Sequence, residues 1–159
     1  MPRRPPVGTH LALLAGATLA LPVAACGSDA IRVSTPKPTG AVAAACTRVV
    51  AALPRDLDAA LRHRATSPPS PFTRAWGHPA VTLRCGVELP KPVSAGVIEA
   101  SGRCWGSPDL NADPVTLVTR GPEPPIELTV PARVVPEHVL GAVSPLLSAG
   151  PCPTRAPGG

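Results

Sequence analysis

Five cysteines constrain the fold of this chain more than any other feature of its sequence. They stand at positions 26, 46, 85, 104 and 152, and the first of them closes an apolar N-terminal stretch. The other four form an even set in a short chain, which is typical of a small exported domain held together by two disulfides. Four cysteines allow three different pairings. Disulfides would compensate for a core that can draw on few aromatic side chains, namely Phe72, Trp76 and Trp105.

The N-terminal stretch has the parts of a bacterial lipoprotein signal peptide. Arg3 and Arg4 give a positive start, and the apolar run over residues 11–21 is shorter than the roughly 20 residues of a membrane-spanning helix. Small residues then stand directly before a cysteine in Val23-Ala24-Ala25-Cys26, as a lipoprotein signal peptidase requires. We predict cleavage before Cys26 and a diacylglycerol on its thiol. Ordinary cleavage followed by secretion is the alternative.

The composition divides the chain into four parts. Residues 1–25 are the predicted signal peptide, and residues 26–45, rich in Gly, Ser, Thr and Pro, are predicted to be a flexible tether. Residues 46–152 are predicted to form one domain, because they hold the four remaining cysteines and the apolar alternations of strands. Residues 153–159 are expected to be a disordered tail.

Alternating apolar residues predict strands in the middle of the domain. They cover residues 80–88, 96–100, 115–119 and 126–130. In the first of them Val81, Leu83, Cys85 and Val87 share one face, which directs Cys85 toward the core. The last two strands are expected to pair as a hairpin around a proline-rich loop.

Helical spacing flanks these strands. Residues 46–53 predict a helix that ends before Pro54, and a second short helix is expected from Pro54 to about residue 63. A C-terminal helix is expected from Pro136, with a kink at Pro145. This order predicts an α+β fold, a small antiparallel sheet of about four strands with an N-terminal and a C-terminal helix on one face, stapled by disulfides.

The sequence lacks the residue patterns that are typical of nucleic-acid binding and of metal binding. The full chain carries a formal net charge of +5 with the charges scattered and few aromatic residues, so no nucleic-acid surface is expected. The four domain cysteines include no Cys-x-x-Cys pair and no clustered histidine, so no metal site and no cofactor is expected.

Catalytic motifs are also missing from the sequence. It contains no Gly-x-Ser-x-Gly, no His-Glu-x-x-His and no glycine-rich phosphate loop. The domain histidines, at positions 63, 78 and 138, are isolated from one another. The acidic pairs Asp56/Asp58 and Asp109/Asp113 are interpreted as capping or solvated residues rather than as a pair of catalytic carboxylates. We therefore expect no catalytic residues.

The segment 75–87, Ala-Trp-Gly-His-Pro-Ala-Val-Thr-Leu-Arg-Cys-Gly-Val, resembles the central motif of domain of unknown function 3515. This is a family of small exported proteins from high-GC Gram-positive bacteria, and the resemblance covers about residues 46–147. Its members resemble lipoproteins or membrane-tethered envelope proteins and have no assigned activity, so the resemblance implies a location and a fold. It favours a Cys46–Cys85 disulfide, since both cysteines lie in the family-like part, and leaves Cys104 and Cys152 as the second pair.

Four residues are candidates for binding, each with a structural alternative. Trp76 and His78 could contact a sugar or a peptide, whereas the alternative is that Trp76 anchors the core. Arg84, on the outer strand face, and Arg120, at the start of the hairpin loop, could together hold a carboxylate or phosphate. The alternative is that both arginines are solvated surface residues.

The expected function is that of a cell-envelope lipoprotein on the outer face of the cytoplasmic membrane. Its domain would bind or scaffold an envelope protein or a cell-wall component without catalysis. One alternative is an enzyme that acts on the cell wall, with His78, Arg84 or Arg120 at its site. The other is an inhibitor-like module whose stiff loop at residues 121–125 enters a partner's cleft.

Overall fold

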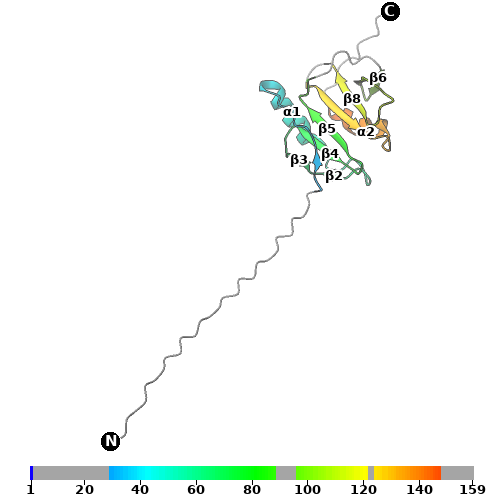
Figure 1. The fold of residues 1–159 in the computed structure, drawn as a ribbon. Helices are drawn as coiled ribbons and strands as arrows, with labels where there is room; N and C mark the ends of the chain where they lie inside the picture. Colours follow the sequence, from blue (N-terminus) through cyan, green and yellow to red (C-terminus); the bar gives the residue numbers. More distant parts are fainter. Residues whose placement is uncertain (2–28, 89–95, 122–123, 148–159) are drawn as a thin grey trace, which may run out of the picture.

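The computed structural model describes Met1 and residues 29–88, 96–121 and 124–147 (Figure 1). Its helices are α1 (Gly40–Ala52), α2 (Pro136–Val143) and the short 3-10 helix η1 (Ser144–Leu146). Its strands are β1 (Ile31–Arg32), β2 (His63–Arg64), β3 (Thr66–Ser67), β4 (Thr73–Trp76), β5 (Val81–Cys85), β6 (Gly96–Ala100), β7 (Arg103–Ser107), β8 (Val115–Arg120) and β9 (Ile126–Val130).

Seven of these strands form one sheet in the order β2-β4-β5-β9-β8-β7-β6. All neighbours in this sheet are antiparallel, whereas β1 and β3 form a separate parallel pair. The chain is therefore a mixed α/β protein with a mostly antiparallel sheet, as the sequence predicts at that level. The expected number of about four strands is too low, because β4 and β7 also belong to the sheet and β2 extends its edge.

The strands that the sequence predicts lie where their apolar alternation places them. In β5, Val81, Leu83 and Cys85 are buried while the two residues between them are half-exposed. β8 and β9 form the expected hairpin, with Leu117 opposite Leu128. These side chains face the helices and form one core cluster with residues of α1 and α2.

The N-terminal helix differs from the prediction at both ends. It begins at Gly40 rather than at Cys46, and it ends at Ala52, just before Leu53 and Pro54. The second short helix expected up to residue 63 is absent, and that part of the chain bends instead. The side chain of Asp58 accepts hydrogen bonds from the backbone N–H groups of Ala60 and Leu61, and that of Asp56 accepts one from His63. These capping bonds stabilise a compact loop rather than a helix.

The predicted flexible tether over residues 26–45 is wrong from β1 onward. The backbone N–H of Ile31 donates to the carbonyl of Ala65 at 2.8 Å, and Val33 is buried. The following extended segment, Ser34–Thr39, lies over the outer face of the sheet, and we call it the strap. Gly86, at φ +81°, leaves room for it: a Cβ there would lie 2.6 Å from the Cβ of Pro38. The strap is ordered because the sheet holds it, which no local pattern could indicate.

A disulfide joins Cys46 of α1 to Cys85 of β5, as the family resemblance implies. Both residues are fully buried, so the bond fixes the helix to the middle of the sheet. Cys104 in β7 is also buried and takes part in a disulfide, while Cys152 lies outside the described residues. The Cys104–Cys152 pairing stays a prediction. Residues 2–25 of the predicted signal peptide, Cys26 and the predicted tail at 153–159 likewise lie outside the described residues.

The C-terminal helix begins at Pro136 as predicted. Near Pro145 the α-helix gives way to η1, so the chain changes its helical geometry where a kink is expected. The hydroxyl of Ser144 accepts a hydrogen bond of 3.0 Å from the indole N–H of Trp105, which attaches this end of the helix to β7.

Candidate functional site

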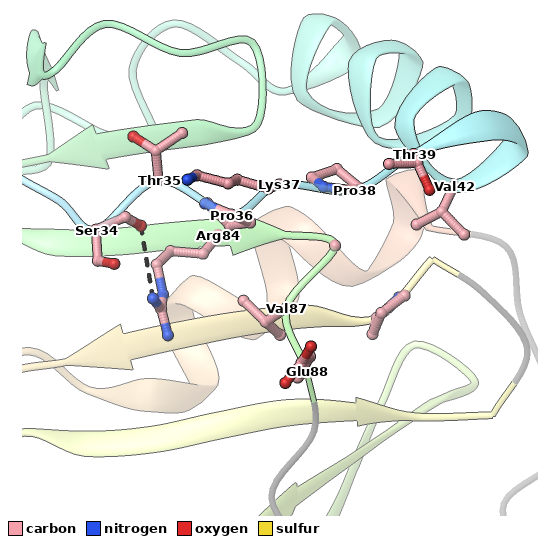
Figure 2. Close-up of a pocket in the computed structure, with 12 residues that line it drawn as sticks. Ser34, Thr35, Pro36, Lys37, Pro38, Thr39, Val42, Arg84, Val87 and Glu88 are labelled. Atoms are coloured by element: carbon pink, nitrogen blue, oxygen red, sulfur yellow. Dashed lines mark hydrogen bonds between the residues drawn. The ribbon is translucent and has the colours of Figure 1, made fainter.

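A hollow lies between the strap and the C-terminal end of β5. This strap groove has a volume of about 570 Å³. The strap forms one side, and Figure 2 shows Val87 and Glu88 across from it. Its lining comprises the strap residues together with Val42, Arg84, Gly86, Val87, Glu88 and Pro125. A volume of this size is in the range of pockets that hold small ligands.

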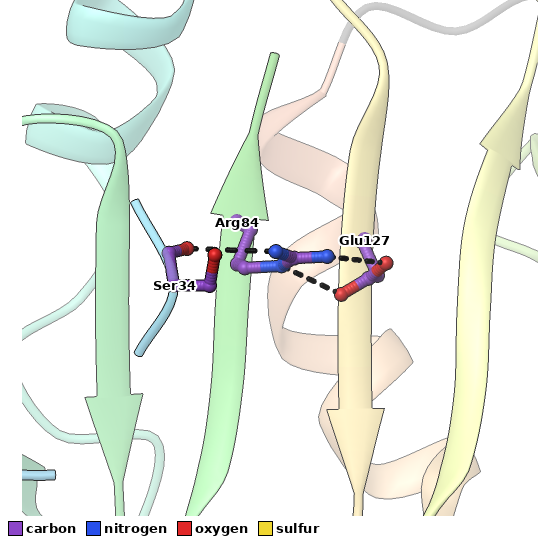
Figure 3. Close-up of polar contacts among 3 residues, drawn as sticks. All are labelled: Ser34, Arg84 and Glu127. Carbon is purple, nitrogen blue, oxygen red and sulfur yellow. Dashed lines mark hydrogen bonds and ion pairs between the residues drawn. The ribbon is translucent and has the colours of Figure 1, made fainter. Parts of the chain in front are cut away.

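Arg84, which lines the strap groove, is paired with Glu127 (Figure 3). The two residues stand opposite each other on β5 and β9. The Nε and Nη2 atoms of Arg84 donate to the two carboxylate oxygens of Glu127 at 2.8 and 2.9 Å. A third nitrogen, Nη1, donates to the backbone carbonyl of Ser34 at 3.5 Å. The guanidinium thus cancels the charge of one carboxylate and holds the strap to the sheet.

This geometry corrects both sequence interpretations of Arg84. It is not a solvated surface arginine, because its side chain is 27 % exposed and bidentately paired. It does not join Arg120 in an anion clamp either, since Arg120 lies beyond β9 on β8 and is not among the described residues that line the strap groove. Glu127, which the sequence analysis did not single out, takes the guanidinium fork instead.

The strap groove therefore offers mixed polar and apolar contacts. Lys37 and Glu88 place opposite charges in its lining, and Pro36 and Pro38 contribute apolar surface. The hydroxyl of Thr35 is buried without a hydrogen-bond partner among the described residues. A buried unpaired hydroxyl costs about 1–3 kcal/mol, which a ligand or water could recover by bonding to it.

The two other candidates, Trp76 and His78, separate in the structure. Trp76 is fully buried in the core cluster, and its Nε1 donates to the carbonyls of Pro54 and Arg55 at 3.3 and 3.0 Å. Its ring is therefore not available to stack on a ligand. His78 is exposed in the turn between β4 and β5 and does not line the strap groove.

A second, smaller cleft contains a carboxylate–histidine contact that the sequence did not predict. The Nε2 atom of His138, in α2, lies 2.8 Å from a carboxylate oxygen of Asp58. Arg133 and Val135 also line this His138 cleft, whose volume is about 230 Å³. This contact could not be predicted from the sequence, because 80 residues separate Asp58 from His138 and only the fold brings them together.

The carboxyl of Asp58 has a pKa below its usual value. The backbone N–H of Leu61 is the main cause, with further contributions from Ala60 and from the charge of His138. Asp58 therefore remains ionised and holds the imidazole in place. Such a carboxylate–histidine pair is one part of a general-base arrangement. No serine, threonine or cysteine lines the cleft among the described residues, so a nucleophile is not part of it there.

Within residues 29–88, 96–121 and 124–147, no three His, Cys, Asp or Glu side chains come close enough to hold a metal ion. In the same ranges no helix has the length and apolarity needed to cross a bilayer.

Comparison with known protein families agrees with the resemblance at residues 75–87. The family model described as Protein of unknown function (DUF3515) matches residues 6–150. The chain belongs to the DUF3515 family. The match extends from the predicted signal peptide to the end of the C-terminal helix, so both helices and the whole sheet lie within the DUF3515 region. No curated protein and no solved structure matches the chain.

Proposed function

We propose that this DUF3515 protein is a cell-envelope lipoprotein, anchored by lipid on Cys26, whose domain binds an envelope protein or a cell-wall component without catalysis. It would lie on the outer face of the cytoplasmic membrane, with secretion as the alternative. Support for the anchor comes from the small residues directly before Cys26 and from the apolar run that precedes them. A buried disulfide is also typical of exported domains.

The strap groove is the feature that supports the proposed binding role. It is larger than the His138 cleft, and the arginine in its lining is already neutralised by Glu127. An active site needs an unsatisfied acid, base or nucleophile at a concave surface. The strap groove instead offers a fixed ion pair, two further opposite charges and proline surfaces, which suit contact with a polar or peptide-like partner.

Site-specific crosslinking in intact cells tests this role. A photoreactive amino acid at Lys37, in the strap groove, should yield a discrete crosslinked adduct, whereas the same residue at Arg48, exposed on α1, should not. The adduct should weaken when Glu88→Lys reverses the charge across the groove. Equal adducts at both positions, or an adduct that ignores Glu88→Lys, would show that the strap groove is not the contact surface.

The His138 cleft is the one observation that favours the enzyme alternative. A histidine oriented by an ionised carboxylate can accept a proton, and Arg133 beside it could attract an anionic substrate. Purified protein incubated with isolated cell walls decides between the roles. The binding proposal expects no soluble wall fragments above background. Fragment release that disappears in His138→Gln would instead support a wall-acting enzyme.

The inhibitor-like alternative depends on the loop between β8 and β9. Only Gly121, Pro124 and Pro125 of this loop are described, and Pro125 lines the strap groove. Substituting residues 121–125 by a short Gly/Ser turn would abolish binding if the loop enters a partner's cleft. If the strap groove is the contact surface, Glu88→Lys should reduce the crosslinked adduct more than the loop substitution does.

A further inference from the structure

The place where the chain enters the domain is fixed at one end of the sheet. The guanidinium of Arg64 donates to the backbone carbonyl of Asp29 at 2.6 Å and to that of Gly77 at 3.4 Å. Gly77 belongs to the turn between β4 and β5, and its N–H donates to the carbonyl of Arg62 at 2.8 Å. Asp29 is therefore held beside this turn. We call the turn and the loops next to it, at the same end of the sheet, the entry end.

The chain between the predicted lipid and the entry end is very short. Cys26 and Asp29 are three residues apart, and an extended chain spans at most about 3.6 Å per residue, so their Cα atoms lie within about 11 Å of each other. The headgroup layer of a bilayer is itself about 5–8 Å thick on each side. An acylated Cys26 would consequently hold the entry end at the level of the headgroups.

Two loops accompany the β4–β5 turn at this end. Thr82 pairs with Thr129 and Val115 with Val130, so the start of β8 and the end of β9 lie at the same end of the sheet as the start of β5. The loops that adjoin them carry two exposed large apolar side chains, Leu110 at 42 % and Val135 at 63 % exposure. Exposed apolar side chains of this kind are compatible with the boundary between headgroups and acyl chains.

Charge at the entry end is mixed and does not decide the orientation. Arg62 and Arg133 are exposed there, and the carboxylates of Asp58, Asp109 and Asp113 accept hydrogen bonds from nearby backbone N–H groups. Histidines 63, 78 and 138 also lie at or next to this end. The orientation is therefore inferred from the short distance between Cys26 and Asp29 and from the exposed apolar residues Leu110 and Val135.

We propose that the entry end rests on the phospholipid headgroups and that the strap groove faces away from the membrane. Gly86, in the strap groove, follows Ala80 by six residues, or about 20 Å of strand. The strap, which follows β1 in the chain, forms one side of this groove (Figure 2). The partner would thus approach from the cell-wall side, and His78 would be a headgroup contact. This orientation rests on the proposed acylation of Cys26.

Headgroup crosslinking of the lipidated protein tests the orientation. The full-length protein, extracted from membranes, is reconstituted into phosphatidylglycerol vesicles that contain lipids with photoreactive headgroups. Crosslinked residues should fall in segments 77–80, 109–111 and 133–135, and not in segments 85–88 and 101–102 at the opposite end. The matched control inserts a Gly/Ser linker of about 20 residues after Gly27, with a mean span of about 25 Å, and should reduce these crosslinks several-fold.

The outcomes separate the orientation from the anchor. The mass of the extracted protein first shows whether Cys26 is acylated, and an unmodified Cys26 would overturn both proposals. An acylated protein that crosslinks equally at both ends of the sheet, or whose crosslinks ignore the inserted linker, would overturn the orientation alone.

Discussion

Arg84 on β5 faces Glu127 on β9 and donates two hydrogen bonds of 2.8 and 2.9 Å to its carboxylate. The same guanidinium reaches the carbonyl of Ser34, so one side chain joins two central strands to the strap. The guanidinium therefore has two roles: its charge, within the lining of the strap groove, is neutralised by Glu127, and its bond to Ser34 holds the strap to the sheet.

Arg84→Ala should lower the free energy of unfolding by about 1–2 kcal/mol. The substitution leaves the carboxylate of Glu127, which is 15 % exposed, without its partner, and partial exposure of the pair limits the loss. Urea denaturation measures the change. Arg48→Ala removes an exposed arginine from α1 and should change stability by less than about 0.5 kcal/mol. Similar losses in the two variants would contradict a structural role of the ion pair.

Trp76→Ala should destabilise the domain by about 3–5 kcal/mol, because the ring is fully buried. Trp76→Phe retains most of the apolar volume but loses the indole N–H that bonds to Pro54 and Arg55, so its cost should be smaller. Thermal unfolding of both variants measures the effect. An unchanged melting temperature in Trp76→Ala would mean that the side chain is not part of the core in solution.

Replacing Cys46 and Cys85 together by alanine should cost up to about 4 kcal/mol, since the disulfide closes a loop of 39 residues in the unfolded chain. Mass spectrometry of a digest kept non-reducing should find the two cysteines in one linked peptide pair. A peptide linking Cys46 to Cys104 or Cys152 would refute the pairing.

Lowering the pH should remove a contribution of Asp58 to stability. Its folded-state pKa lies below the ordinary value of 3.8, so the contribution is present above that pH and is lost as the pH falls through the folded-state pKa. Asp58→Asn should therefore be less stable than the wild type at pH 6, and the difference should shrink toward pH 3. A difference that is independent of pH would show that the charge of Asp58 does not contribute.

The sequence predicted the parts of the fold that follow a local period. β5 and β9 show their alternation of apolar and polar residues, and α2 begins at a proline in a position that favours helix starts. β7 was missed because all five of its residues are buried, so it has no alternation to read. The two-residue strands are too short for any period to appear.

The candidate site depends on contacts that no local pattern records. The strap has the composition of a flexible linker, and its order comes from the packing of Pro38 at Gly86 and the bond from Arg84 to Ser34. Arg84 could be placed on the outer face from sequence, yet its partner Glu127 stands 43 residues away on a strand whose register was not known. The same holds for His138 and Asp58.

The mass of the mature N-terminal peptide tests the central claim, the lipid anchor, most directly. Protein extracted from the membrane fraction and digested should give a peptide that begins at Cys26 and carries a diacylglyceryl group on its thiol. Cys26→Ala should leave an unprocessed precursor or release the protein from the membrane. A mature chain that begins elsewhere, or at Cys26 with a free thiol, would contradict the account.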